Sequence, residues 1–507
     1  MSFPTNMPTF AFWTRTDRDS PALITPEGEI RTVGQVQDSA NQIARNLQAL
    51  GVQKGDVVAY CLKNSAEVFE LLLATTQIGL YHTPISWHLT APEMQYILTD
   101  SGAKVVIASG EVAALCQGTQ ARVFAVGGAP GIEAFESLKT GPTEPPPERS
   151  AGGVMTYTSG TTGKPKGVRR PLPPVPPEPV ASAFAMFLLI YGMKPGDGVH
   201  IVTSPLYHTA VVYFAVNCLH LGHSVVIMEK WSAEGFLERV QQYRVTNSHM
   251  VPTQLVRLLE VEDKGRYDVS SLRHMVHSAA PCPVSVKKAI LDWWGPVLYE
   301  YYAASEGGGT MVTPQEWLAR PGTVGKPWPT ADIKIFDEQG FELPSGQVGT
   351  VYIKMAQSFE YHRDKTKTEQ AWRTDGYFTV GDAGYLDAEG YLFLCDRKAD
   401  MIISGGVNIY PAEIEGVLIG HPRVADVAVF GIPDDKWGEQ VKAVIQLHGE
   451  PTPGLEQELL AWAGERLAKF KQPRSIDFVP ALPRDPNGKL KKRLLRDPYW
   501  AHLGRSI

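Results

Sequence analysis

The 507-residue chain is 43% hydrophobic and 20% charged, and it carries a formal net charge of −6 at pH 7. This length allows roughly three domains, and the composition is that of an ordinary globular protein. The negative charge argues against a broad nucleic-acid-binding surface, so local basic groups would have to hold any anionic partner.

The cysteines and the chain ends bear on cellular location. The five cysteines are scattered without a pair at metal-ligand spacing, so we expect reduced thiols in a cytosolic protein. No basic stretch followed by an apolar run opens the chain, and its last residues, RSI, differ from the peroxisomal signal SKL, which favours a cytoplasmic location. The longest apolar run, 180–192, is too short to span a bilayer. We expect a buried helix there, and peripheral membrane contact stays open.

Helix and strand patterns alternate along the first third of the chain. Residues 32–50 and 66–79 place apolar side chains at helical spacing, whereas 56–62 and 103–108 indicate buried strands. This alternation predicts a parallel sheet with helices on its faces. The proline-rich stretch 141–148 predicts a linker or loop.

The next stretch, YTSGTTGKPKG at 157–167, packs three glycines, five hydroxyls and two lysines into eleven residues. Glycines let backbone N–H groups approach a ligand, hydroxyls add short donors, and lysines add positive charge, so the run predicts a phosphate-binding loop rather than a flexible surface loop. An apolar lead-in at 154–157 predicts the strand that feeds it. Pro165 stands where a P-loop needs its second glycine, which excludes that motif.

The organisation changes twice after this loop. The polyproline run 171–179 is either a ligand for a partner domain or, as we favour, a stiff connection. Strand and helix patterns then resume, until short strands from about residue 331 predict a small antiparallel sheet or barrel. The block from about residue 398 has enough length and pattern for a separate α+β domain.

Several polar residues in the later part of the chain are candidates for chemistry. His208, in SPLYHTAVVY at 204–213, would by itself be read as a structural imidazole. Glu306 follows a predicted strand, at the end where α/β folds bind ligands, although a solvated loop carboxylate is the alternative. Lys489 follows a PNG turn but could belong to a basic tail. Further motifs occupy 277–283 and 377–415, the latter containing Asp382 and Arg397.

These motifs, in this order, resemble those of the adenylate-forming superfamily, which includes acyl-CoA and aryl-CoA synthetases, nonribosomal adenylation domains and luciferases. The phosphate loop matches almost letter for letter, and the stretch 377–415 is the second strong match. The resemblance implies an α/β fold: a large N-terminal domain (1–396) of stacked α/β layers with a small antiparallel β-barrel, a hinge (397–400), and a small mobile α+β domain (401–507).

The resemblance also implies residue roles. Catalysis would use Lys489, Glu306 and Lys166. The implied ATP- and AMP-binding residues are Thr158, Ser159, Gly160, Thr161, Thr162, Gly163, Lys164, Ser278, Ala279, Ala280, Tyr302, Ser305, Asp382 and Arg397. The implied acid-binding residues are His208, Val211, Met250 and Ala303. Glu306 and Thr161 would hold Mg²⁺, and Gly405 and Gly406 would line a coenzyme A channel.

Two departures from the family pattern bear on the substrate. The usual Tyr-Gly-x-Thr-Glu is here Tyr302, Ala303, Ala304, Ser305 and Glu306, and the alanine in place of glycine should narrow the acid channel. No acidic side chain lies between residues 204 and 216 to pair an amino acid's ammonium group. A hydrophobic acid is therefore expected. At the hinge, Ala399 replaces the usual Asp or Lys, so Lys398 or Asp400 is also a candidate pivot.

The sequence therefore predicts an acyl-CoA synthetase that uses ATP, Mg²⁺ and coenzyme A to activate a fatty acid or a steroid side-chain acid. An aryl-acid CoA ligase and an enzyme that loads a carrier protein are the alternatives, and a luciferase-type oxygenase or a nucleotide-sensing scaffold is less favoured. Small-molecule partners and no nucleic acid are expected, and homodimerisation stays possible.

Overall fold

The computed structural model describes residues 10–158, 165–397, 400–405, 407–484 and 490–501, with Arg397 described through its backbone only. The chain divides into two compact units. Unit 1 comprises residues 1–250, 261–276 and 357–370, and unit 2 comprises residues 251–260, 277–356 and 371–507.

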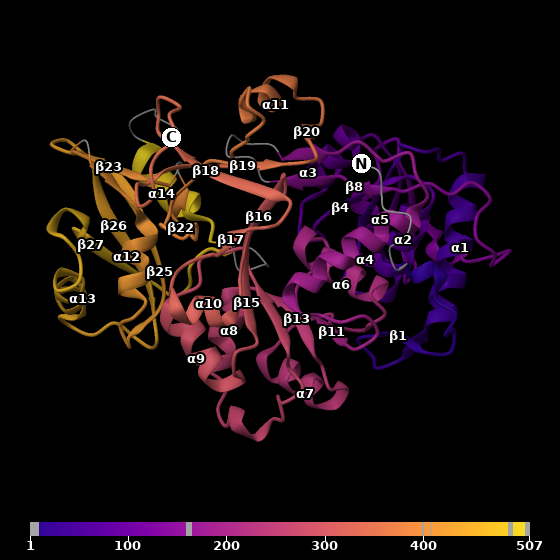
Figure 1. Ribbon diagram of the computed structural model, residues 1–507, viewed down its shortest axis with the longest axis horizontal. Helices are drawn as coiled ribbons and strands as arrows, with labels where there is room; N and C mark the ends of the chain where they lie inside the picture. Colours follow the sequence, from indigo (N-terminus) through magenta and orange to yellow (C-terminus); the bar gives the residue numbers. More distant parts are fainter. Residues whose placement is uncertain (1–9, 159–164, 398–399, 406, 485–489, 502–507) are drawn as a thin grey trace. The chain divides into compact units, whose positions relative to one another are not determined.

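Unit 1 contains the predicted parallel sheet (Figure 1). Its strand order is β7 (Glu133–Ala134), β6 (Arg122–Val126), β5 (Ala103–Ser109), β3 (Val57–Cys61), β4 (Tyr81–Pro84) and β8 (Gly153–Val154). All these pairings are parallel. The helices between the strands are α1 (Val33–Ala49), α2 (Ala66–Gln77), α3 (Ala91–Ser101) and α4 (Gly110–Ala113).

A second sheet of unit 1 is also mainly parallel. Its strands include β2 (Ile30–Thr32), β1 (Pro21–Ile24), β12 (Ser224–Ile227), β11 (Val199–Val202) and β13 (Asn247–Met250), paired in that order, and β14 (His274–His277) follows in the chain. Helices α5 (Pro177–Met186), α6 (Thr209–His220) and α7 (Ala233–Tyr243) accompany it. One continuous apolar core contains side chains of α1, α2, α6 and both sheets.

The remaining sheet of unit 1 carries the stems of the predicted phosphate loop. Strand β10 (Lys166–Arg169) lies between β9 (Thr156–Thr158) and β20 (Glu360–Tyr361), and both pairings are antiparallel. Helix α11 (Lys365–Ala371) follows β20. A segment from late in the sequence thus completes the sheet that supports the loop.

Unit 2 contains three groups of strands. The hairpin β15 (Leu298–Ala304) and β16 (Gly307–Val312) pairs with β17 (Lys326–Pro327), and helices α8 (Pro252–Leu259), α9 (Val284–Trp294) and α10 (Pro314–Ala319) belong to the same unit. The predicted antiparallel sheet consists of β18 (Ala331–Phe336), β19 (Gly349–Met355), β21 (Asp382–Leu386) and β22 (Leu392–Arg397).

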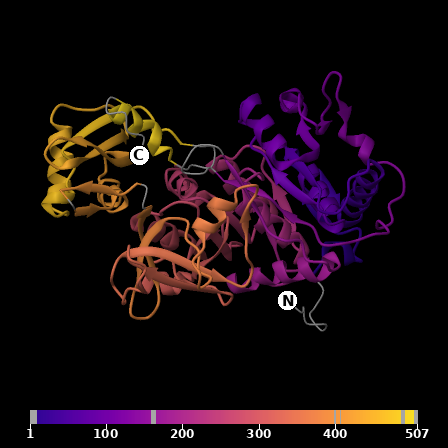
Figure 2. The same cartoon turned by 90° about the horizontal axis from the view of Figure 1, so that it is seen from above.

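The C-terminal block forms the predicted α+β arrangement, drawn in yellow and light orange in Figure 2. Its strands are β23 (Ile402–Ser404), β24 (Val407–Ile409), β25 (Val424–Asp434), β26 (Gly438–Leu447) and β27 (Ser475–Val479), and its helices are α12 (Pro411–Leu418), α13 (Leu455–Gly464) and α14 (Lys492–Trp500). It has an apolar core of its own.

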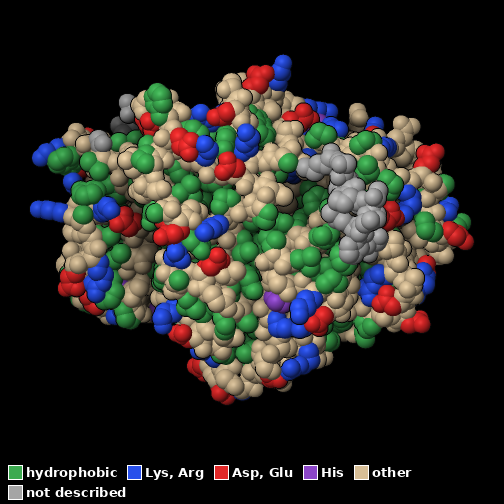
Figure 3. Space-filling view, in the orientation of Figure 1, with side chains coloured by type: hydrophobic (Ala, Val, Ile, Leu, Met, Phe, Trp, Pro, Cys, Tyr) green, Lys and Arg blue, Asp and Glu red, His purple; other side chains and the backbone are tan. Residues whose placement is uncertain are grey.

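One expectation about a surface segment needs correction. Residues 180–192 do not form a fully buried helix: they are the end of α5 and a 3-10 turn, and they expose 45% of Phe184 and 38% of Leu189. The buried residues of α5 are Pro177, Ala181, Ser182 and Ala185, which recur at helical spacing and so form one face of the helix. No helix in the described part of the chain is both long and apolar enough to cross a bilayer. Basic and acidic side chains are interspersed on the face shown in Figure 3.

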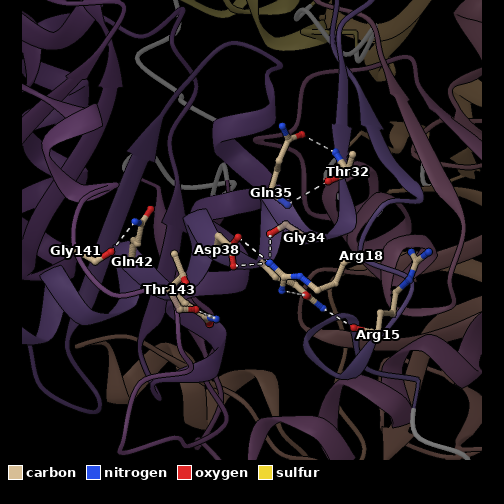
Figure 4. Close-up of polar contacts among 11 residues, drawn as sticks. Arg15, Arg18, Thr32, Gly34, Gln35, Asp38, Gln42, Gly141 and Thr143 are labelled. Carbon is tan, nitrogen blue, oxygen red and sulfur yellow. Dashed lines mark hydrogen bonds and ion pairs between the residues drawn. The ribbon is translucent and has the colours of Figure 1, made fainter.

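The proline-rich stretch 141–148 forms a loop, one of the two forms expected for it, and this loop is bound to helix α1. Side chains of α1 donate hydrogen bonds to backbone carbonyls of residues 138–148, which we call the strap. The donors are Asn41, Gln42, Arg45, Asn46 and Gln48. Figure 4 shows the Gln42 to Gly141 contact and the capping of α1 by Thr32 and Gln35.

Candidate active site

The stems of the phosphate loop are firmly held in unit 1. Thr158 at the end of β9 pairs with Lys166 at the start of β10. The Tyr157 hydroxyl donates to Asp100 at 2.6 Å, and burial together with that carboxylate raises the pKa of Tyr157. The Tyr96 hydroxyl donates to the Pro165 carbonyl at 3.1 Å. Both ends of the loop are therefore fixed. Its predicted ligands Ser159, Gly160, Thr161, Thr162, Gly163 and Lys164 lie outside the described residues.

Lys166 has a partner that sequence reasoning missed. Its ammonium forms an ion pair with Asp364, whose other carboxylate oxygen accepts the Lys367 N–H at the start of α11. Both side chains are about three-quarters buried, with 28% and 21% of their surface exposed. No local pattern marks Asp364, because it lies 198 residues from Lys166 in the chain.

The β15–β16 hairpin positions four predicted site residues in unit 2. Tyr302 and Ala303 lie on β15, and Ser305 and Glu306 form the turn to β16. Glu306 is 8% exposed. A Cβ on Gly309, opposite Ala303, would lie 2.2 Å from the Tyr302 carbonyl oxygen, so only glycine fits there. Ala303 is therefore opposite a residue, Gly309, that has no side chain that could move aside.

Residues from two separate motifs meet around Asp382. The Tyr302 hydroxyl donates to the Asp382 carboxylate at 2.6 Å, and Asp382 is 9% exposed. On the neighbouring strand, the backbone of Arg397 is directly opposite Asp382. Strand pairing therefore brings together Asp382 and Arg397, the two residues that the resemblance implies as ligands of the nucleotide's ribose. The hydrogen bond from Tyr302 orients the Asp382 carboxylate.

The segment 277–283 joins β14 to α9, and the resemblance to the adenylate-forming enzymes predicts that it lies against the adenine. Ser278 is buried and hydrogen-bonds to the side chain of Tyr301 on β15. Ala279 has φ +75°, a left-handed conformation that is strained for alanine, and Ala280 is half-buried. The segment is thus held in an unusual backbone shape.

The predicted acid-binding residues occupy both units. His208 precedes the first turn of α6 in unit 1. Val211 on α6 and Met250 on β13 belong to the same unit and are 1% and 0% exposed. Ala303 belongs to unit 2. His249, which the sequence reasoning missed, is buried beside Met250, 5.2 Å from the Phe214 ring, and burial lowers its pKa to about 3. The sequence feature that marks His249 is the polar run NSH at 247–249, which lies in the buried strand β13.

The C-terminal block holds both stems of the turn predicted to carry the catalytic lysine. Arg484 pairs with Asp426 at 2.6 Å and bridges to Leu490, and Lys492 pairs with Glu415 at 2.8 Å. Burial raises the pKa of the Glu415 carboxyl. Lys489 itself, like Gly406 and the hinge residues Lys398 and Ala399, lies outside the described residues.

Gly405 is described and has φ +58°. A Cβ there would meet the Trp437 ring at 2.6 Å, so a side chain cannot be added without moving the tryptophan. The role of Gly405 in a thiol channel stays a prediction.

A magnesium ion fits the donors present. Among the described residues there is no group of three or more His, Cys, Asp or Glu side chains that could hold a metal. Mg²⁺ bound with a nucleotide takes one or two protein carboxylates and completes its shell with phosphates and water. The single carboxylate of Glu306, at the end of a strand, suits that mode of binding.

Comparison with known proteins agrees with this arrangement. Residues 10–360 match the family of AMP-binding enzymes, and residues 413–489 match its C-terminal domain. The fatty acid–[acyl-carrier-protein] ligase ScoC of Streptomyces coeruleorubidus is 32% identical over 526 residues, covering 98% of this chain and 97% of ScoC. The long-chain-fatty-acid–CoA ligase FadD13 of Mycobacterium tuberculosis is 32% identical over 492 residues, covering 95% of each protein.

The ATP-bound crystal structure of MatB from Rhodopseudomonas palustris is similar along almost its whole length. It superposes with a TM-score of 0.85 at 28% identity, covering 97% of this chain and 99% of MatB. Matches of this extent establish the family. The chain therefore belongs to the AMP-binding enzymes of the adenylate-forming superfamily, which are ATP-dependent, AMP-forming ligases.

Proposed function

We propose that the chain is an acyl-CoA synthetase that joins a hydrophobic carboxylic acid to coenzyme A in two steps. The observation that carries the proposal is the convergence on Asp382: Tyr302 donates to its carboxylate, and Arg397 is opposite it in the strand ladder. A buried carboxylate beside an arginine can accept both ribose hydroxyls while the arginine donates to the same sugar.

In the first step, a carboxylate oxygen of the acid attacks the α-phosphorus of ATP. The bond from that phosphorus to the bridging oxygen breaks, and pyrophosphate leaves. Because two anions must approach and a third must depart, the protein contributes mainly charge neutralisation and in-line positioning. Lys166 and Lys489 would supply positive charge, and Mg²⁺ held by Glu306 would neutralise the phosphates.

In the second step, the thiolate of coenzyme A attacks the acyl carbon, and AMP leaves with the electron pair of the broken mixed anhydride bond. Residues 401–507 would move as a lid about the hinge at 397–400, presenting Lys489 for the first step and the strand with Gly405 for the second. The first family match ends at residue 360 and the second begins at residue 413, so the proposed hinge falls in the stretch between them.

A fatty acid or a steroid side-chain acid is the proposed substrate class. The buried Val211 and Met250 are apolar, and no acidic residue occurs between 204 and 216 to bind an ammonium group. An aryl acid remains the alternative within the same chemistry. Cytoplasmic location, membrane contact and homodimerisation stay predictions from the sequence.

A second candidate function is the loading of a carrier-protein thiol. The similarity to ScoC favours it, because that relative is named as a ligase for an acyl carrier protein. The two candidates share the first step and differ only in the thiol that accepts the acyl group.

The test measures release of AMP and pyrophosphate with ATP, Mg²⁺ and a panel of fatty, steroid and aryl acids, each without thiol, with coenzyme A, and with a phosphopantetheinylated carrier protein. Turnover that requires coenzyme A and prefers fatty or steroid acids supports the proposal. Turnover only with the carrier protein favours the second candidate, and no turnover with any acid refutes both.

Lys489→Ala should separate the two steps. It should slow adenylation roughly 100- to 1000-fold, because loss of one charged contact to the transition state costs about 3 to 4 kcal/mol, and it should leave thioester formation from supplied acyl-AMP nearly unchanged. Lys491→Ala, an exposed neighbour in the same basic run, is the matched control. Equal loss in both steps would contradict the assigned role.

A further inference from the structure

A buried carboxylate joins the two ends of the segment that links β14 to α9, here called the 278–283 loop. Glu300 lies on β15, and its Oε2 is 2.6 Å from the Lys287 Nζ and 3.5 Å from the His277 Nε2. His277 is the last residue of β14, and Lys287 lies in the first turns of α9. One carboxylate oxygen thus contacts the residues on either side of the loop.

This cluster is almost completely out of water. The Lys287 and His277 side chains are 0% exposed and that of Glu300 is 9% exposed. Burial raises the pKa of the Glu300 carboxyl, and the Lys287 ammonium opposes that rise. The ammonium also lies 4.7 Å from the centre of the Trp317 ring. A buried ion pair adds little net stability over an apolar pair of the same size, so its more informative role is in fixing geometry.

The side chains of the loop itself are short. Its side chains are small or cyclic, in the order Ser278, Ala279, Ala280, Pro281, Cys282 and Pro283. Ala279 holds a left-handed conformation, and α9 begins without a side-chain cap. The contact of Ser278 with Tyr301 on β15 is a second tie to the same strand. A strained loop of this kind persists only where its surroundings determine it.

Strand β15 also carries Tyr302, which orients Asp382. Three consecutive residues of β15 therefore make these contacts. Glu300 contacts His277 and Lys287 at the two ends of the 278–283 loop, and Tyr301 contacts Ser278 within it. Tyr302 donates to the Asp382 carboxylate. We propose that Glu300, held by Lys287, is a positioning residue that fixes the 278–283 loop for recognition of the nucleotide's base. This inference rests on the proposed ATP site and adds the residue on which discrimination between adenine and other bases depends.

The test measures the dissociation constants of ATP and GTP by titration calorimetry, which requires no knowledge of the acid. Glu300→Gln leaves a buried cation without its counter-ion and endangers folding. The decisive variant therefore removes both charges, as Lys287→Met with Glu300→Gln. Its ATP dissociation constant should rise at least tenfold and its preference for ATP over GTP should fall at least tenfold, while binding of pyrophosphate stays within threefold.

The matched control removes another Glu–Lys pair, the buried Glu70 with the partly buried Lys139 in unit 1, whose closest atoms are also 2.6 Å apart. Glu70→Gln with Lys139→Met should leave the ATP preference unchanged. An unaltered ATP preference in the Lys287–Glu300 variant, or an equal loss in both variants, would overturn the inference.

Failure of the proposed function gives a different result. If the unmodified chain binds ATP but turns over no acid, the proposed synthetase activity is refuted. The binding measurements on the Lys287–Glu300 variant can still be interpreted in that case. An unmodified chain with no preference for ATP over GTP refutes the positioning role directly.

Discussion

The Tyr302 hydroxyl donates a hydrogen bond to the carboxylate of Asp382, which lies 80 positions later in the chain. That hydrogen bond fixes the direction in which Asp382 presents its oxygens. A hydrogen bond to a charged group is worth about 1.5 to 3 kcal/mol. The tyrosine is therefore expected to contribute to nucleotide affinity through the aspartate, whether or not it touches the nucleotide.

Tyr302→Phe removes this donor and keeps the ring. We expect the affinity for AMP to fall roughly tenfold or more, in line with the energy of a charge-assisted hydrogen bond, as measured by titration calorimetry. Tyr299→Phe, on the same strand, is the control. If pyrophosphate, which has no ribose, loses affinity to the same degree as AMP, the effect does not pass through Asp382.

At the scale of elements, the strap at 138–148 behaves as part of α1. Five side chains of that helix bind its carbonyls, and Asn41 is the most buried of them at 7% exposed. Its Nδ2 donates to the Thr143 carbonyl at 2.8 Å, while its Oδ1 accepts from Gln77 on α2 at 3.2 Å. Asn41 thus connects the strap with two helices, whereas Gln48 binds the strap at an exposed position with a 3.3 Å contact.

Asn41→Ala should lower the stability of unit 1 by about 1 to 3 kcal/mol, because the Thr143 carbonyl loses its Asn41 donor and the Gln77 amide keeps only its 3.4 Å contact with the Ala40 carbonyl. Gln48→Ala should change it by less than about 0.5 kcal/mol. Thermal unfolding and the rate of proteolytic cleavage within the strap would measure both. Similar behaviour of the two variants would show that the strap is held by its own packing.

At the scale of the whole molecule, buried histidines make stability depend on pH. Burial lowers the pKa to about 3 for His82, His220 and His249 and to about 4 for His200. In the unfolded chain these groups take up protons near pH 6.5. Above about pH 6.5 the histidines are neutral in both states, and the free energy of unfolding does not depend on them. Below that pH the unfolded chain binds protons that the folded protein does not, so the free energy of unfolding falls until the pH reaches the pKa values of the folded protein.

Acidification from pH 7.5 to 5.0 should cost about 2 kcal/mol of unfolding free energy per histidine, seen as a falling thermal midpoint. His220 offers a specific check, since its Nδ1 accepts the Phe12 N–H at 3.0 Å. In His220→Gln the amide oxygen can accept the same bond without titrating, so the midpoint should fall less steeply. A midpoint that is flat across this range in the unmodified chain would contradict the pH argument.

Local elements could be predicted from the sequence because their signals are local. Helix α1 and strand β3 lie inside the predicted ranges 32–50 and 56–62, since apolar spacing and turn glycines mark them. Tyr302 and Asp382 could both be identified as candidates, but the hydrogen bond between them could not, because the two residues lie 80 positions apart. The partners Asp364 and Glu300 were not predicted, because no pattern in the sequence states which distant carboxylate a lysine will meet.

The sheet that supports the phosphate loop has a consequence for synthesis of the chain. Strand β10 is complete at Arg169, but its outer neighbour β20 begins only at Glu360. At a translation rate of about 5 to 20 residues per second, the ribosome needs roughly 10 to 40 s to make the intervening residues. During that interval β10 has an open edge, which is a site for unwanted strand pairing, and the counter-ion of Lys166 does not yet exist. The sheet that carries the stems of the phosphate loop is therefore complete only after about seven-tenths of the protein has been made.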